Sequence, residues 1–130
     1  GWFNGGQAVA EPKVEFTKIK SLDDLNQAIA KSQKPVFLDF YADWCIECVR
    51  MEKTTFKDPE IVRLTQQMTV LKADVTANDA VDAELMQHFG IVGPPASLFF
   101  AADGTPLKPQ NFFACQSASD LKRTFEKILN

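Results

Sequence analysis

The twelve residues from Phe37 to Cys48, Phe-Leu-Asp-Phe-Tyr-Ala-Asp-Trp-Cys-Ile-Glu-Cys, place the strongest constraint on how this chain can fold. The run that begins one residue earlier, at Val36, and ends at Tyr41 has the composition of a buried strand, interrupted by one carboxylate, Asp39. After the turn the spacing becomes helical, and one helix face is expected to carry Cys45, Cys48, Val49, Glu52 and Phe56. The sequence therefore predicts a strand, a short turn and a helix that begins with two cysteines.

The predicted helix start determines the chemistry of these cysteines. Cys45 falls at the helix N-terminus, where free backbone N–H groups and the helix dipole stabilise a thiolate. Cys48 lies about one helical turn further on, within bonding reach of Cys45. The pair therefore predicts a reversible dithiol/disulfide centre.

Two other uses of a C-x-x-C pair fit the sequence less well. Structural zinc requires four ligands, and the chain offers only Cys115 and His88 as further soft ligands. A purely structural disulfide would close too small a loop to restrict the unfolded chain much, and it would leave the neighbouring Trp44 unexplained. We therefore predict no metal and no cofactor beyond the redox-active disulfide. His88 is expected near a helix end, as a partly exposed capping residue.

Length and composition indicate one compact domain, because the chain has 130 residues of which 45% are hydrophobic. Residues 1–12 contain three glycines and no periodicity, so we expect a flexible linker or tail there and a domain at 13–130. The net charge of −3, with no basic run, argues against a nucleic-acid partner. No apolar stretch reaches the roughly 18 to 20 residues of a membrane span, and the opening residues show no signal-peptide pattern, so neither feature is expected within these residues. A soluble, monomeric domain is expected.

The rest of the chain alternates strand and helix patterns. Strands are expected near 14–19, from 36, at 69–74, at 96–100 and, more weakly, at 112–115 after an Asp-Gly hairpin signal. Helices are expected at 21–31, from 45, at 59–67, at 79–89 and from 117 onward, several of them opened by Ser or Asp caps. The order β-α-β-α-β-α-β-β-α predicts an α/β fold with a mixed central sheet and helices on both faces.

The pattern resembles a known family. Asp39, the Trp44-Cys45-x-x-Cys48 motif and Pro95 at the head of the 96–100 strand are similar to the thioredoxin superfamily, over about residues 14 to 129. Shorter strings resemble the C-terminal domain of the DsbD family of transmembrane reductant transporters: Tyr41-Ala-Asp-Trp-Cys-x-x-Cys, Glu52, Thr54-x-Phe56, Asp58-Pro59, Asp74-Val-Thr-Ala-Asn-Asp79 and Phe99-Phe100.

The resemblance implies a thioredoxin-like fold and a thiol:disulfide interchange activity, that of a protein-disulfide reductase. It also implies a periplasmic location, with the domain tethered to the inner membrane as part of a larger protein. In that family the domain takes electrons from the membrane-embedded domain and passes them to the N-terminal domain of the same protein. Protein disulfides are thus the expected partners.

Thiol–disulfide exchange and the resemblance together suggest roles for the site residues. Cys45, expected to be exposed, attacks the partner disulfide, and Cys48, expected to face inward, resolves the mixed disulfide. Trp44 and Pro95, a cis-proline by resemblance, are expected to shape the docking face. Pro94 has no N–H to offer to a partner, unlike the residue that usually precedes this proline in the family.

Carboxylates are expected to influence the thiols. Asp39 is expected to accept the proton of Cys48 or to tune its pKa, the alternative being that it hydrogen-bonds core backbone. Glu52 shares the helix face of the cysteines, and no lysine or arginine of the helix shares it. With Asp39 and Glu47 it is therefore expected to oppose ionisation of Cys45.

Two further residues have open roles. We favour a solvated side chain for Lys72, with a pair to Asp39 as the alternative. Cys115, at the end of the weak strand, is expected to be a small buried apolar residue, with a reactive thiol as the alternative.

Two rival functions are kept beside the relay. One is a stand-alone disulfide reductase with broad substrates. The other is a peptide-binding module without redox activity. Turnover in an insulin-reduction assay separates the module from both redox functions, since only a working dithiol turns over.

Overall fold

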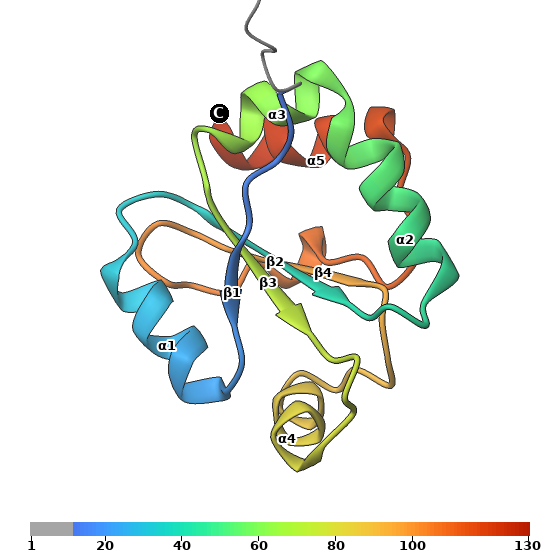
Figure 1. Ribbon diagram of the computed structural model, residues 1–130. Coiled ribbons are helices and arrows are strands. Elements are labelled where there is room, and N and C mark those ends of the chain that lie inside the picture. Colours follow the sequence, from blue (N-terminus) through green and yellow to red (C-terminus); the bar gives the residue numbers. More distant parts are fainter. Residues whose placement is uncertain (1–11) are drawn as a thin grey trace, which may run out of the picture.

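The computed structural model describes residues 12–130, so nearly all of the predicted linker at 1–12 lies outside the described residues. Four strands form one sheet: β1 (Thr17–Ile19), β2 (Val36–Tyr41), β3 (Thr69–Asp74) and β4 (Ala96–Phe100). Their order is β1-β3-β2-β4, in which β1, β3 and β2 are parallel and β4 is antiparallel to β2. The predicted mixed sheet is confirmed, and β2, which leads to the cysteines, lies between two neighbours (Figure 1).

Helices cover both faces of this sheet, as predicted. One face carries α1 (Leu22–Lys31) and α4 (Ala80–His88), and the other carries α2 (Ile46–Lys53), α3 (Pro59–Thr65) and α5 (Ala118–Leu129) (Figure 1). The side chains of β2 alternate between the two layers because successive residues of a strand point to opposite faces. Leu38 and Phe40 belong to the core on the α1 and α4 side, whereas Phe37 belongs to the core under α2, α3 and α5.

Local capping explains where most helices begin. Ser21 and Asp79 each form a capping box, with Asp24 and Asp82 respectively. Asp58 accepts two backbone N–H groups at the start of α3, directly before Pro59. These caps satisfy backbone groups that would otherwise remain free, so the helix starts follow from short stretches of sequence.

The predicted fifth strand at 112–115 is wrong. The chain does turn at Gly104, whose φ of 92° suits glycine, but the returning segment makes only isolated bridges, from Pro106 to Phe100 and from Phe112 to Ser97. Proline cannot donate to a sheet ladder, and Asn111 Oδ1 instead accepts the Phe99 N–H at 3.0 Å. The Asn111 side chain and the two isolated bridges thus cover the outer edge of β4, although no fifth strand forms there.

The predicted helix from Cys45 is shorter than expected. It ends at Lys53, and Phe56 belongs to a separate 3₁₀ turn, η2 (Thr55–Lys57). Its buried residues are Cys48 and Met51, while Val49 is only half-buried. No helix within residues 12–130 is long and apolar enough to cross a membrane.

Candidate active site

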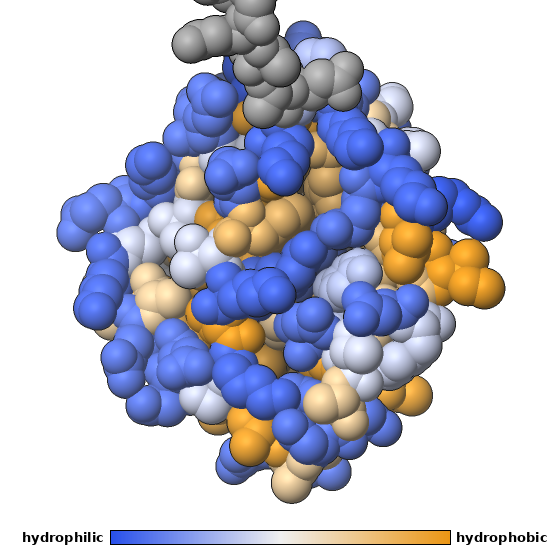
Figure 2. Space-filling model, viewed as in Figure 1, coloured by the Kyte–Doolittle hydropathy of each residue, from blue (hydrophilic) through white to orange (hydrophobic). Residues whose placement is uncertain are grey.

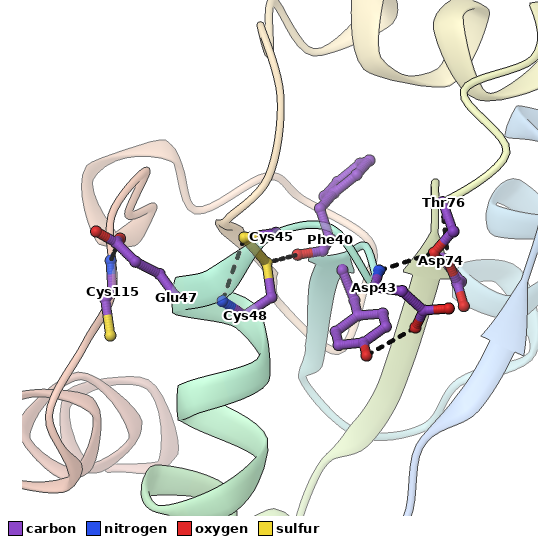
Figure 3. The surroundings of a disulfide bond; sticks show 9 residues. Phe40, Asp43, Cys45, Glu47, Cys48, Asp74, Thr76 and Cys115 are labelled. Carbon is purple, nitrogen blue, oxygen red and sulfur yellow. Dashed lines mark hydrogen bonds between the residues drawn. A yellow bond between two sulfur atoms is a disulfide. The ribbon is translucent and has the colours of Figure 1, made fainter.

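The two cysteines occupy the N-terminus of α2, at the end of the buried strand β2. They form a disulfide with a Cα–Cα distance of 5.2 Å (Figure 3). Cys45 is the N-cap residue, and its sulfur accepts the backbone N–H of Cys48 at 3.2 Å. The predicted position of Cys45 at the helix start is confirmed, and this N–H and the helix dipole will favour its thiolate after reduction.

Both cysteines are buried in this disulfide form. Cys45 is 7% exposed and Cys48 4%, so the predicted contrast between an exposed and an inward-facing cysteine is wrong for the oxidised state. The Cys45 sulfur is turned toward its own helix by the disulfide and by the N-cap hydrogen bond. Cys48 Sγ lies deeper, 3.8 Å from the carbonyl oxygen of Phe40 on β2. Only a small part of Cys45 is thus open to the solvent in the disulfide form.

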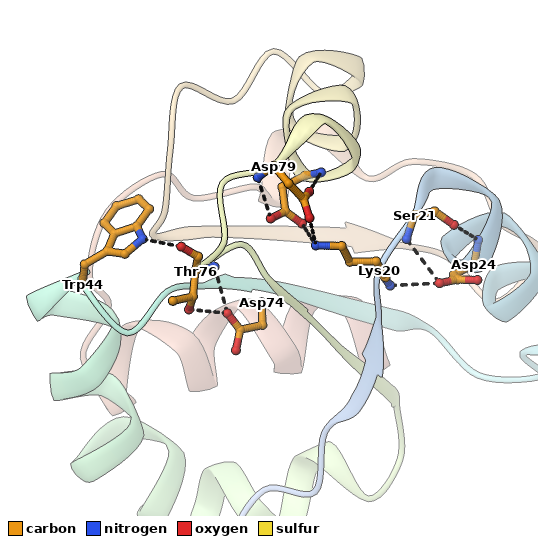
Figure 4. Close-up of polar contacts among 8 residues, drawn as sticks. Lys20, Ser21, Asp24, Trp44, Asp74, Thr76 and Asp79 are labelled. Carbon is orange, nitrogen blue, oxygen red and sulfur yellow. Dashed lines mark hydrogen bonds and ion pairs between the residues drawn. The ribbon is translucent and has the colours of Figure 1, made fainter.

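Trp44 is held beside the disulfide by the loop that follows β3. It is 55% exposed, and its Nε1–H donates to the Thr76 carbonyl at 3.0 Å (Figure 4). The Asp43 N–H donates to Thr76 Oγ1 at 2.9 Å, and the Thr76 hydroxyl donates to Asp74. Burial raises the pKa of Asp74, but the hydrogen bonds from Thr76 outweigh it and hold that pKa below its usual value. The loop thus fixes the tryptophan from outside the C-x-x-C motif.

Sequence reasoning missed this support. An Asp two residues before a Thr is a local signal for a turn closed by the side chain. On the strand side, the Tyr41 hydroxyl donates to Asp43 at 2.9 Å. Burial, followed by the hydrogen bond to Asp43, raises the pKa of Tyr41 to about 12.

Asp39 lies in the interior beneath α2, on β2. It is 4% exposed, and its carboxyl accepts no hydrogen bond from any residue in the described part of the chain. Burial raises its pKa well above the ordinary value; the charge of Lys72 lowers it and that of Glu52 raises it. The alternative role, a hydrogen bond to core backbone, is therefore not seen. A buried carboxyl with a raised pKa holds a proton more readily than an ordinary carboxyl, so its carboxylate is suited to accept one.

Lys72 takes neither of the two positions considered from sequence. Its side chain is 12% exposed, and its Nζ pairs with Glu52 Oε2 at 2.6 Å instead of with Asp39. The ammonium also lies 4.6 Å from the ring centres of both Phe16 and Tyr41. Lys72 stands opposite Asp39 in the β2–β3 register, which places it under α2. The helix itself contributes no cation beside Glu52, as expected, but Lys72 of β3 supplies one, so the carboxylate is not uncompensated.

Glu47, inside the C-x-x-C motif, points away from the disulfide. Its Oε1 accepts the Cys115 backbone N–H at 3.3 Å (Figure 3). Cys115 is a free cysteine, half-buried against the core under α5, and it lies in a loop rather than at a strand end. This contact joins the active-site helix to the segment before α5.

Two more predicted features have clear positions. The peptide bond between Pro94 and Pro95 is cis, as the resemblance implied, and β4 begins directly after it. His88 is the last residue of α4 and is exposed, so its expected place near a helix end is confirmed, but the residue that caps the helix is Phe89. Within residues 12–130, no three His, Cys, Asp or Glu side chains are grouped so that they could hold a metal ion.

The fold and this site together define the class of protein to which the domain belongs. A four-stranded mixed sheet between helix layers carries a C-x-x-C disulfide that caps a helix, with an exposed tryptophan and a cis-proline loop in the same domain. Such a domain belongs to the class of thiol–disulfide oxidoreductases, in which a reduced C-x-x-C pair exchanges with a disulfide.

Comparisons with known proteins agree. A family model described as "Thioredoxin-like" matches residues 17–102, and the chain belongs to this thioredoxin-like family. The chain is 46% identical over 103 residues to the thiol:disulfide interchange protein DsbD of Salmonella typhi, an overlap of 78% of this chain and 18% of that protein. It is 43% identical over 106 residues to DsbD of Escherichia coli strain K12, covering 79% and 19%. The chain thus spans about a fifth of the length of these curated relatives.

A solved structure matches this chain over nearly the whole length of the solved domain. The oxidised C-terminal domain of DsbD from Neisseria meningitidis superposes with a TM-score of 0.71 at 28% identity, covering 86% of this chain and 99% of that domain. The reduced form of the same domain gives a TM-score of 0.69. The resemblance to the DsbD C-terminal domain is confirmed.

Proposed function

We propose that this domain is an electron relay within a longer membrane protein of the DsbD kind. It accepts reducing equivalents from a membrane-embedded domain and passes them to a partner domain in the periplasm. The observation that carries the proposal is the match to nearly the whole DsbD C-terminal domain, together with a disulfide at the start of α2. The parent protein anchors the domain to the inner membrane and supplies both neighbours.

The forward step is a balanced exchange. In the reduced domain the Cys45 thiolate attacks one sulfur of the partner disulfide, which forms a mixed disulfide and releases a partner thiolate that takes up a proton. The Cys48 thiol loses its proton, and its thiolate attacks the Cys45 sulfur. The Cys45–Cys48 disulfide forms, the second partner thiol is released, and two electrons have left the domain. The membrane-embedded dithiol restores the reduced pair by the reverse sequence.

The surrounding residues have defined tasks in this scheme. Asp39 is buried and its pKa is raised, so its carboxylate is a stronger base than an ordinary one and accepts the Cys48 proton, and the Glu52–Lys72 pair sets the charge around it. Trp44, Pro94 and Pro95 form the face against which the partner docks. No metal or organic cofactor takes part in the scheme.

The proposal is tested by comparing rates. The reduced domain is mixed in a stopped-flow instrument with the oxidised N-terminal domain encoded by the same parent gene, and separately with insulin. We expect the partner domain to react at least about a hundredfold faster, because a docked complex replaces random encounter. Cys45→Ser should abolish transfer, and the matched variant Cys115→Ser should retain it. Equal rates with both substrates would favour a stand-alone reductase, and no reaction with either would favour the non-redox module.

A further inference from the structure

A basic hollow lies beside the far end of the active-site helix. It has a volume of about 470 Å³ and is bounded on one side by residues 13–18 and on the other by the end of α2 and by η2. Val14, Phe16 and Phe56 provide its apolar surface. In the view of Figure 2, apolar surface between β1 and α2 is bordered by hydrophilic side chains. The volume falls within the roughly 300–1,000 Å³ of sites that bind small molecules or side chains.

The charge of the hollow is opposite to that of the whole protein. Five lysines and two glutamates line it, a net charge of +3, whereas the chain carries −3. Four of the lysines are exposed and form no ion pair with a residue at 12–130: Lys13, Lys18, Lys53 and Lys57. The fifth, Lys72, is paired with Glu52 at the inner wall. A concave site lined by one sign of charge concentrates ligands of the other sign.

Each wall of the hollow contributes two of the four exposed lysines, which together form its rim. Lys13 and Lys18 come from the strand side, and Lys53 and Lys57 come from the helix side. The long apolar stems of lysine can lie along the phenylalanine rings while the ammonium groups reach the solvent. A ligand that fits must therefore present negative charge to both walls and apolar surface to the floor.

We propose that this hollow binds an extended acidic peptide segment in which carboxylates flank an apolar side chain. An extended chain alternates its side chains between two sides, which places charge toward the rim and an apolar group on the floor. The hollow lies at the C-terminal end of α2 and the disulfide at its N-terminal end, so a helix of eight residues, about 12 Å, separates them. The segment can bind while Cys45 engages its partner.

The test uses the isotope-labelled, oxidised 130-residue protein at low ionic strength. A capped pentapeptide of alternating glutamate and leucine is titrated and followed by amide resonances. We expect saturable shifts confined mainly to residues 13–18 and 52–57, with weaker binding in high salt. Lys53→Gln/Lys57→Gln should weaken binding about fivefold, as expected from two partly screened charge contacts.

Matched controls separate this site from general charge attraction. Lys31→Gln/Lys127→Gln removes the same charge from positions that do not line the hollow and should leave the affinity within about twofold. A peptide with glutamine in place of glutamate should not bind. Equal losses in the two double variants, or equal binding of the neutral peptide, would overturn the proposal. Pyrophosphate binding tighter than the acidic peptide with the same shifts would assign the site to small anions instead.

Discussion

Replacing Lys72 by methionine tests the buried charge arrangement beneath the active-site helix. Methionine keeps much of the apolar bulk of the side chain but removes the ammonium group that pairs with Glu52 at 2.6 Å. Asp39 also loses the positive charge that lowers its pKa, so that pKa should rise further. We therefore expect both a less stable protein and a less readily ionised Cys48.

The structure sets the size of the stability effect. Breaking a fully buried ion pair costs about 3–5 kcal/mol, and exposed pairs contribute about 0.2–1 kcal/mol. Lys72 is 12% exposed and Glu52 33%, so their pair lies between these limits. The two aromatic rings at 4.6 Å from the ammonium add a cation–π contribution of about 1 kcal/mol. A loss of about 2–3 kcal/mol in the free energy of unfolding is expected.

Urea denaturation of the oxidised protein measures this loss, with Lys53→Met as the exposed control from the same hollow. A double-mutant cycle with Glu52→Gln isolates the pair, and its coupling should be at least about 1 kcal/mol. For the reduced protein, Lys72→Met should shift the pH midpoint of Cys48 alkylation upward. Without the ammonium group, the negative charges of Asp39 and Glu52 are less compensated, and they disfavour the Cys48 thiolate. The reasoning is refuted if Lys72→Met costs the same with and without Glu52, or if the alkylation profile does not move.

Three other changes test single residues. Because burial raises the folded-state pKa of Asp39 above the unfolded value near 3.9, stability should fall as the pH rises from that value through the folded pKa. Asp39→Asn should therefore be more stable than the wild type at pH 7 and no more stable at pH 3; a measured advantage that is independent of pH would contradict this. Cys48→Ser should trap a mixed disulfide through Cys45, seen by non-reducing electrophoresis and mass spectrometry, and trapping by Cys45→Ser would reverse the two roles. Pro94→Leu supplies a backbone N–H next to Pro95 and should tighten partner binding by up to about 1 kcal/mol in calorimetry, whereas an unchanged affinity would show that the contact is not used.

Much of the fold follows from local sequence. The strands 69–74 and 96–100 were predicted with the bounds that the structure has, because each is an apolar run between turn signals. Helix starts at Ser21, Asp58 and Asp79 depend on hydrogen bonds within three residues, so they too are encoded locally. The chemistry of the motif is local as well, since the position of Cys45 as N-cap requires only the turn and the helix that follows.

The charge environment of the site was decided by tertiary structure. Sequence reasoning placed Glu52 on a helix face without a cation, but Lys72 reaches it across 20 residues from another element. The Glu47 carboxylate likewise points away from the disulfide and accepts the backbone N–H of Cys115, which is 68 residues away in sequence. The missing fifth strand has a similar origin, because an asparagine side chain satisfies the Phe99 N–H that a strand would have paired. Hydrogen-bond patterns within a turn are fixed by spacing along the chain, whereas Coulomb interactions depend on distance in space, which only the packing of α2 over β2 and β3 sets.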